Sequence, residues 1–227
     1  MIWRLAICFS AGLLVPLSAG NVTGRVQTAS GDGAVVWLQP VQQMSRAATG
    51  VSLTAKIQQR NKTFTPHLLA VQIGTTVQFP NLDPFFHNAF SNYSGQVFDT
   101  GLYAPGTSKS IVFRRPGVVR VFCNIHPAMS AVIVAVESPY FAVSAKDGSF
   151  AVPGVPPGEY TLHVFTERAS KEFLDGLATK VVVDQGSTAV GTIEADDKGF
   201  RPVPNHKNKY GKEYPAVIVD QYPGTKP

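Results

Sequence analysis

The sequence is poor in cysteine and in charge, and it has no long apolar run after its first twenty residues. Only 2 of its 227 residues are Cys, and 15% are charged. The excess of 20 Lys and Arg over 15 Asp and Glu is too mild to indicate a nucleic-acid partner. What the sequence does contain is 17 Pro and 20 Gly between short runs of Val, Ile, Phe and Tyr, which predicts a β-rich fold with few helices.

The first twenty residues are typical of a secretory signal peptide. Arg4 precedes an apolar stretch from Leu5 to Leu17, and small residues follow at 18–20. The apolar stretch is too short, and too soon followed by polar sequence, for a membrane span. We therefore expect an exported, periplasmic protein whose mature chain begins near Asn21 and has no stable membrane span after cleavage.

Removal of such a peptide would take away Cys8 and leave Cys123 as the only cysteine. Cys123 would then have no internal partner for a disulfide, although exported proteins meet an oxidising compartment. Three states of the thiol are open: buried and inert, paired with another chain, or bound to a metal. Composition does not choose among them.

Short apolar runs separated by turn residues extend over most of the chain. Strands of this length at this spacing favour a sandwich or a barrel. The segment 169–176 reads as a loop or one helical turn, and the chain beyond Gly199 as an extended arm. The expected strands are 22–28, 34–38, one around 51–57, 68–73, 76–79, 109–113, 118–123, 131–136, 140–144, 149–152, 160–165, 180–183 and 188–194.

One short loop between two expected strands carries three metal-binding side chains. Cys123, His126 and Met129 are spaced three residues apart and bring a thiolate, an imidazole and a thioether together. Two His, one Cys and a weak axial Met form the blue-copper arrangement, so the loop needs a second histidine from elsewhere. His87, in or just after the loop that follows the strand 76–79, is the natural candidate.

Other readings of this loop are open. Zinc also binds Cys and His, but a structural zinc site usually has more than one Cys or a Cys2His2 set, and Met is a poor zinc ligand. Taken singly, Cys123 could be a small buried hydrophobe, Met129 core filling and His126 an ordinary loop histidine. The spacing of all three, in a chain without another mature cysteine, favours copper.

The stretch from about Lys56 to Glu137 resembles the cupredoxins, and within them the plastocyanin-like proteins often labelled methylamine-utilisation proteins. The resemblance implies a Greek-key β-sandwich with one type 1 copper ion, and Asn88 as a residue that steadies the ligand loops and donates toward the thiolate sulfur. The short C-x2-H-x2-M spacing is similar to that of amicyanin. The matching residues are Gly74 to Val77, Asn81 to Asp83, His87-Asn88, Pro116-Gly117 and the loop Cys123 to Met129.

Two outer segments resemble the carboxypeptidase-regulatory-like β-sandwich. They are Gly24 to Val26 with Ala34 to Leu38, and Asp147 to Phe150 with Pro156 to Tyr160. We therefore expect the copper domain to be inserted into this second, small β-sandwich. The expected organisation is a signal peptide at 1–20, the first part of the outer sandwich at 21–50, the cupredoxin domain at 51–137, the rest of the sandwich at 138–198 and a basic, Pro-rich tail at 199–227.

The resemblance implies electron transfer without catalysis. No H-x-H pair occurs, so the paired-His motifs of multicopper oxidases and copper nitrite reductases are absent. We expect a periplasmic dehydrogenase, oxidase or cytochrome to dock near the solvent-facing edge of His126. Copper delivery or buffering with the same four ligands is the chief alternative, and a structural β protein with a degenerate site is a third. The run from His206 to Lys212 predicts a solvated basic arm that could dock to an acidic partner.

Overall fold

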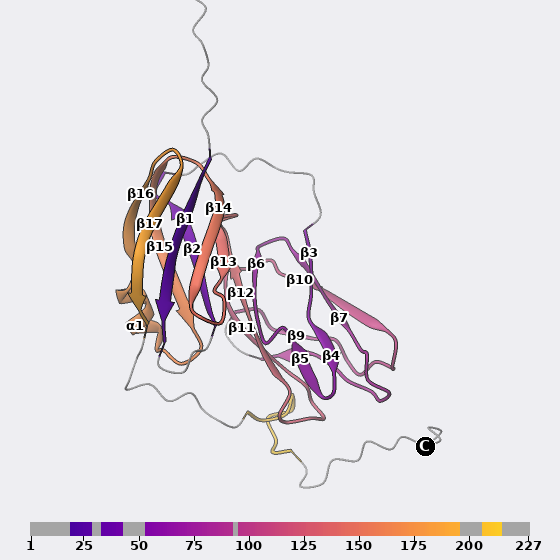
Figure 1. Cartoon of the computed structure of the whole chain (residues 1–227). Coiled ribbons are helices and arrows are strands. Elements are labelled where there is room, and N and C mark those ends of the chain that lie inside the picture. Colours follow the sequence, from indigo (N-terminus) through magenta and orange to yellow (C-terminus); the bar gives the residue numbers. More distant parts are fainter. Residues whose placement is uncertain (1–18, 29–32, 43–52, 93–94, 196–205, 215–227) are drawn as a thin grey trace, which may run out of the picture.

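The computed structural model describes residues 19–28, 33–42, 53–92, 95–195 and 206–214, and the statements below concern these residues. Their regular structure is almost all β, arranged in several sheets of which none closes into a barrel (Figure 1). The one helix within them is the single turn-and-a-half α1 (Lys171–Gly176), which begins after the N-cap Ser170. The predicted all-β class with little helix is therefore confirmed. Residues 1–18 of the predicted signal peptide lie outside the described residues, whereas Gly20 is the first residue of β1 (Gly20–Gln27). No helix among the described residues is long and apolar enough to cross a membrane.

Two sheets built from both ends of the chain form what we call the outer sandwich (Figure 1). Their facing side chains share one core that includes Val22, Leu38 and Leu162. One sheet has the order β14 (Ser149–Val155), β1 (Gly20–Gln27), β17 (Ser187–Glu194), and the other β13 (Phe141–Val143), β2 (Ala34–Pro40), β15 (Gly158–Thr166), β16 (Thr179–Val183).

Strands β1 and β2 pair with strands that follow residue 140 and, among the described strands, with none between 54 and 136. The two points where the chain leaves and re-enters the outer sandwich are neighbours, because the amide of Leu38 donates to the carbonyl of Tyr140 over 2.9 Å. This pairing supports the proposal that the segment between them is an insertion. The domain boundaries given above stay a prediction.

The segment from β3 to β12 folds into three further sheets, which together we call the inner unit. The two larger sheets share a core that includes Val77, Phe79, Val121 and Ile133. One sheet has the order β10 (Ser108–Val112), β7 (Thr76–Pro80), β3 (Thr54–Lys56), another β6 (Leu68–Gln72), β12 (Ser130–Val136), β11 (Gly117–Phe122), β8 (Phe90–Ser91), β9 (Phe98–Asp99), and the third is the hairpin β4 (Gln58–Arg60), β5 (Thr63–Thr65).

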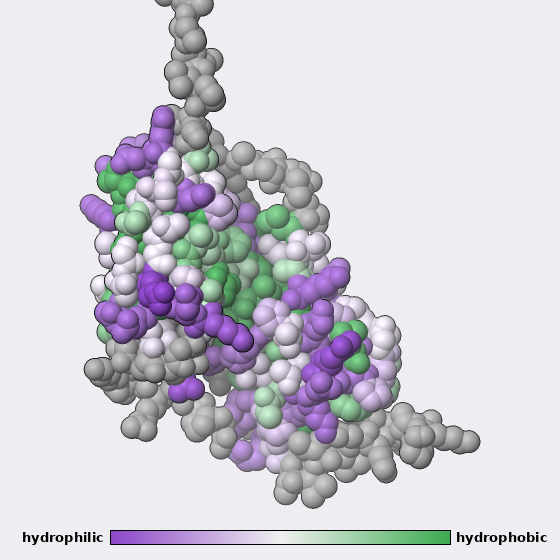
Figure 2. Space-filling view, in the orientation of Figure 1, coloured by the Kyte–Doolittle hydropathy of each residue, from purple (hydrophilic) through white to green (hydrophobic). Residues whose placement is uncertain are grey.

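Strand β12 is buried on both faces and joins the two units. Because side chains alternate along a strand, Ala131, Ile133 and Ala135 face the inner core, whereas Val132 and Val134 face a different apolar cluster. That second cluster also contains Val35 of β2, Phe165 of β15 and Leu174 of α1. In the face seen in Figure 2, apolar residues gather where the two units meet. The outer sandwich therefore packs on the sheet that carries the predicted metal loop.

Candidate metal centre

Three of the four predicted ligands come together in the inner unit. The ligand atoms of His87, Cys123 and His126 all lie within 4.8 Å of one another, and all three residues are buried. Sγ of Cys123 lies 3.8 Å from Nδ1 of His87 and 3.6 Å from Nδ1 of His126, and the two Nδ1 atoms are 3.1 Å apart. The nearest point equidistant from the three atoms is about 2.0 Å from each, which matches a zinc–nitrogen bond of about 2.0–2.1 Å and is shorter than a zinc–thiolate bond of about 2.3 Å.

The ligand loop is a tight connection between β11 and β12. Cys123 directly follows β11, and Met129 directly precedes β12. Two backbone hydrogen bonds close the loop. The amide of Met129 donates to the carbonyl of His126 over 3.0 Å, and the amide of Cys123 donates to the carbonyl of Met129 over 3.3 Å. Met129 is fully buried and belongs to the same core cluster as Cys123, and its role as the fourth ligand stays a prediction.

His87 enters the site from a different part of the inner unit. It lies between β7 and β8, and its backbone forms a bridge with Tyr103: each amide donates to the other's carbonyl, over 3.3 and 2.9 Å. The ring of Phe85 lies 5.2 Å from the His87 ring and 5.5 Å from the His126 ring, measured between centroids. The histidine is therefore fixed at its backbone, and an aromatic ring covers both imidazoles.

Asp83 contacts a predicted ligand, although the sequence pattern did not indicate a role for it at the site. Its Oδ2 lies 2.8 Å from Nε2 of His87, and it also accepts the amides of Asn61 and Lys62. Burial raises the pKa of Asp83, but the hydrogen bonds from Lys62, His87 and Asn61 outweigh it and hold the pKa below the usual 3.8. An ionised Asp83 keeps the proton of His87 on Nε2 and leaves Nδ1 free to bind a metal.

The Cys123 thiol is poised to ionise. Burial raises its pKa, but hydrogen bonds from His126 and His87 and from the backbone amides of Asn88 and Ile125 outweigh the burial and bring the pKa from 9.0 to about 6. The thiolate is the form that binds soft metal ions. The donor set is thus two imidazole nitrogens and one thiolate sulfur, which fits copper by its chemistry.

Asn88 joins the two ligand-bearing segments. Its Oδ1 accepts the amide of Asn124 over 2.6 Å, and its Nδ2 donates to Asp99 over 3.2 Å. Donation toward the sulfur of Cys123 comes from the backbone amide of Asn88 rather than from its side chain. The fully buried side chain holds the residue after His87 against the residue after Cys123, which agrees with the steadying role expected from the resemblance.

Two expectations about the surface near the site are wrong. His126 has no solvent-facing edge of any size, since only 2% of its surface is exposed. Residues 206–214, which we call the strap, do not form a solvated arm. They lie against the ligand loop, where the hydroxyl of Tyr214 donates to the carbonyl of Cys123 over 2.7 Å and Nε2 of His206 lies 2.9 Å from the carbonyl of Pro127.

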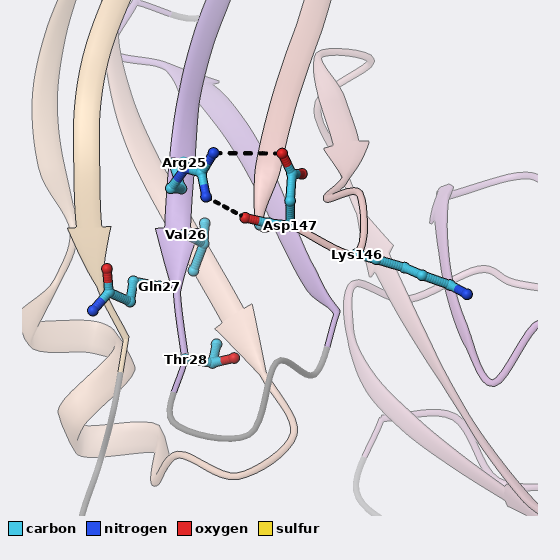
Figure 3. A pocket seen from close by; sticks show the side chains of 7 residues that line it. Arg25, Val26, Gln27, Thr28, Lys146 and Asp147 are labelled. Carbon is cyan, nitrogen blue, oxygen red and sulfur yellow. Dashed lines mark hydrogen bonds and ion pairs between the residues drawn. The ribbon is translucent and has the colours of Figure 1, made fainter.

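A shallow pocket on the outer sandwich offers no comparable chemistry (Figure 3). Its basic side chain Arg25 is already engaged: Nη1 donates to the carbonyl of Asp147 over 2.7 Å, and Nη2 lies 3.4 Å from the Asp147 carboxylate. The pocket lies at a turn that needs a glycine, because a Cβ on Gly148, whose φ is +82°, would lie 2.2 Å from the carbonyl oxygen of Val26. We interpret this pocket as a structural feature of the turn.

Comparison with known proteins finds no match among family models or curated proteins. Among solved structures, a Cu-containing nitrite reductase from Thermus scotoductus SA-01 is 31% identical with a TM-score of 0.36, over 44% of this chain and 26% of that one. A purple cupredoxin from Nitrosopumilus maritimus is 26% identical with a TM-score of 0.33, over 36% of this chain and 98% of that one. A variant of amicyanin in its Cu(I) form is 18% identical with a TM-score of 0.34, over 36% and 81%.

The resemblance to cupredoxins that the sequence predicts thus recurs among solved structures. The matched region covers about a quarter of the nitrite reductase chain, and all three TM-scores are below 0.5. The resemblance of the outer segments to the carboxypeptidase-regulatory-like sandwich stays a prediction.

Proposed function

We propose that this chain is a blue-copper electron carrier in which His87, Cys123 and His126 hold one copper ion and Met129 is the axial ligand. The observation that supports the proposal is the buried group of two imidazole nitrogens and one thiol sulfur within 4.8 Å of one another. A soft, nearly trigonal donor set of this kind suits both oxidation states of copper. When bound, the copper ion would supply a one-electron couple.

The residues around the site favour electron transfer over catalysis. None of the four proposed ligands has more than 2% of its surface exposed, so the arrangement offers no open position to a substrate. Cys123 would give up its proton when metal binds, while Asp83 retains the proton on Nε2 of His87. In each cycle one electron enters and one leaves, and no covalent bond of the protein is made or broken.

The visible spectrum of the copper-loaded protein tests this proposal. Purified protein is titrated with one equivalent of Cu(II), and an intense band at about 600 nm, from charge transfer between the thiolate and copper, is expected. Ascorbate should bleach the band and an oxidant should restore it. A protein that binds Cu(II) without this band, or that binds only zinc, would refute the blue-copper assignment.

Copper delivery or buffering would use the same ligands, but it requires ready release of the metal. The burial of all four proposed ligands counts against rapid release. Incubation of the loaded protein with a mild copper chelator separates the two functions. A carrier should keep its colour for hours, whereas loss of the colour within seconds would favour delivery.

We further propose that the carrier works in the periplasm and exchanges electrons with a redox protein that docks near His126. The signal-peptide pattern of the first twenty residues and the lack of a second mature cysteine support this location. Cell fractionation combined with the mass of the purified chain tests it. A chain that begins near Asn21 in the periplasmic fraction is expected, and an uncleaved chain in the cytoplasm would contradict the proposal.

A further inference from the structure

We propose that the strap, residues 206–214, closes over the ligand loop and controls access to Cys123, so that the strap has to open before a reagent, a metal chelator or a metal donor can reach the site. The inference deepens the proposed function, since it assigns a regulatory segment to the same site. It does not depend on copper for its first test, because access to the thiol can be measured in the metal-free protein.

The strap touches the ligand loop at three points along its length. The hydroxyl of Tyr214 donates to the carbonyl of Cys123, the amide of Lys209 donates to Oδ1 of Asn124 over 3.0 Å, and Nε2 of His206 lies 2.9 Å from the carbonyl of Pro127. The ring of His206 also stacks on Phe122, with 3.8 Å between centroids. Contacts at 122, 123, 124 and 127 cover the loop from its first residue to the residue after His126.

An ion pair connects the strap to Asp99 of β9, which in turn accepts a hydrogen bond from Asn88, the residue after His87. Nζ of Lys209 lies 2.6 Å from Oδ2 of Asp99, with 22% and 38% of the two side chains exposed. The other oxygen of Asp99 accepts from Asn88, and Asn88 in turn accepts the amide of Asn124. Lys209 also contacts Asn124 through its own amide. The strap therefore closes a ring of hydrogen bonds that includes the neighbours of both His87 and Cys123.

The strap has a folded centre of its own. The carboxamide oxygen of Asn208 accepts the amides of Tyr210 and Lys212, and the amide of Asn208 donates to the carbonyl of Lys212. Gly211 has a φ of +72°, a conformation that favours glycine, and completes this turn. These internal hydrogen bonds fix the positions of the strap residues relative to one another, which an extended arm would not do.

Two lysines of the strap form ion pairs instead of projecting into solvent alone. The basic run was expected to project into solvent, but one of its lysines pairs with Asp99 and another, Lys207, lies 3.9 Å from Glu213 within the strap. With the strap in place, Cys123 and Met129 are fully buried and His126 is 2% exposed. The strap is held by hydrogen bonds, one ring stack and a partly exposed ion pair rather than by strand pairing, so it should open at a lower free energy than the core strands.

Alkylation of Cys123 in the metal-free protein measures how often the strap opens. The variants are Tyr214→Phe, which removes one hydroxyl and should keep the fold, and the double variant Tyr214→Phe with Lys209→Gln. The controls are Tyr140→Phe, because Tyr140 packs against the core of the outer sandwich, and Lys207→Gln. Peptide mass spectrometry after iodoacetamide treatment gives the rate at Cys123 itself.

We expect alkylation to be about three times faster in Tyr214→Phe and at least tenfold faster in the double variant, with both controls at the parent rate. If the double variant fails to fold, Tyr214→Phe alone decides. Equal rates in Tyr214→Phe, Tyr140→Phe and the parent would overturn the proposal, because the contacts of the Tyr214 hydroxyl with Cys123 and His206 would then have no influence on access.

The copper-loaded protein gives a second readout that separates this inference from the proposed function. Chelator-dependent loss of the metal should accelerate in the same two variants by a similar factor, with the absorption band of the loaded site unchanged. If the copper-loaded protein is blue but the strap variants change neither the alkylation rate nor the rate of metal loss, only the proposed role of the strap is refuted. A colourless protein whose alkylation responds to Tyr214→Phe would overturn the copper assignment and leave the strap standing.

Discussion

Asp83 and His87 form a buried carboxylate–imidazole pair, with 2.8 Å between Oδ2 and Nε2. The same carboxylate accepts the amides of Asn61 and Lys62, two residues with φ of 53° and 54° in the turn between β4 and β5. One side chain therefore stabilises a hairpin turn whose two central residues have positive φ, and it also orients a proposed metal ligand. A substitution at Asp83 should therefore affect both the turn between β4 and β5 and the orientation of His87.

In Asp83→Asn only one side-chain oxygen remains. With the amide nitrogen in place of Oδ2, His87 and the amide of Lys62 both lose their acceptor, and with it in place of Oδ1 the amide of Asn61 loses its acceptor. We expect copper affinity to fall by about 10- to 100-fold, because His87 loses the partner that fixes its orientation. We also expect the free energy of unfolding of the metal-free protein to fall by about 1–3 kcal/mol. Competition titration against a copper chelator and urea unfolding measure the two effects. Asp175→Asn, an exposed change on α1, is the control and should leave both values at those of the parent.

Asn88→Ala should weaken the link between the two ligand segments without removing the bond to the thiolate. The substitution leaves the amide of Asn124 without its acceptor but keeps the backbone amide of Asn88. We expect a loss of about 1–3 kcal/mol in the free energy of unfolding of the metal-free protein, measured in urea.

The matched control for Asn88→Ala is Gln96→Ala, which also removes two side-chain hydrogen bonds, with Val112 and Arg114, away from the site. Only Asn88→Ala should broaden the absorption band of the copper-loaded protein. If both variants change the band equally, the role assigned to Asn88 is wrong.

Substitution of the two sulfur residues should separate colour from potential. Cys123→Ser should abolish the visible band, since the band arises from the thiolate.

Met129→Leu conserves the volume of the side chain in the core and should cost less than about 1.5 kcal/mol of stability. It should keep the band and raise the reduction potential, because loss of an electron donor disfavours Cu(II) more than Cu(I). Redox titration followed at the band checks this, and an unchanged potential in Met129→Leu would remove Met129 from the ligand set.

The junction between the two units should be acid-sensitive at Glu167. Oε2 of Glu167 lies 2.7 Å from Nε2 of His67, and Oε1 accepts from Arg120 over 3.0 Å. The hydrogen bond from His67 lowers the pKa of Glu167 below 4.5, burial opposes this, and the charges of His67 and Arg120 add to the lowering. A depressed folded-state pKa gives stability that is fully present above pH 4.5 and is lost as the pH falls through the lowered value.

The free energy of unfolding of the parent should therefore decrease more steeply below pH 4.5 than that of Glu167→Gln, which has no carboxylate to titrate. Urea unfolding at a series of pH values between 3 and 7 measures this difference. Glu172→Gln on α1 is the control and should follow the parent. Parallel curves for the parent and Glu167→Gln would show that the cluster contributes no pH dependence.

The sequence predicts the longer strands because they are local patterns: runs of apolar residues mark β11 and β12. The fixed spacing of Cys123, His126 and Met129 likewise marks the loop between these strands. Strand β4 was missed because its residues Gln58 to Arg60 are all polar. The central Gln59 is nevertheless fully buried, where its amide meets the hydroxyl of Tyr103. Burial of a polar strand is decided by distant parts of the chain.

Contacts between distant residues also explain the errors at the site. Tyr214 and Cys123 are 91 positions apart, and His206 and Pro127 are 79 apart, so no local pattern could place the tail on the loop. His126 is buried although a solvent-facing edge was expected, and the Phe85 ring beside it comes from a segment 41 positions earlier. Asp83 lies in the segment Asn81 to Asp83, which matches the cupredoxins in sequence. Its hydrogen bond to His87 nevertheless depends on the path of the loop and not on spacing alone.

The hydrogen bond between Leu38 and Tyr140 has a consequence for the order of folding. Pairing β2 with β13 before the inner unit has formed would close a loop of about 100 residues, at an entropic cost of about 4 kcal/mol. Once the inner unit has folded, its two ends are already neighbours and most of this cost disappears. Pulsed hydrogen exchange during refolding should therefore protect the amides of β11 and β12 before those of β2. The outer sandwich, which holds the first strand of the chain, would then be the last part to assemble.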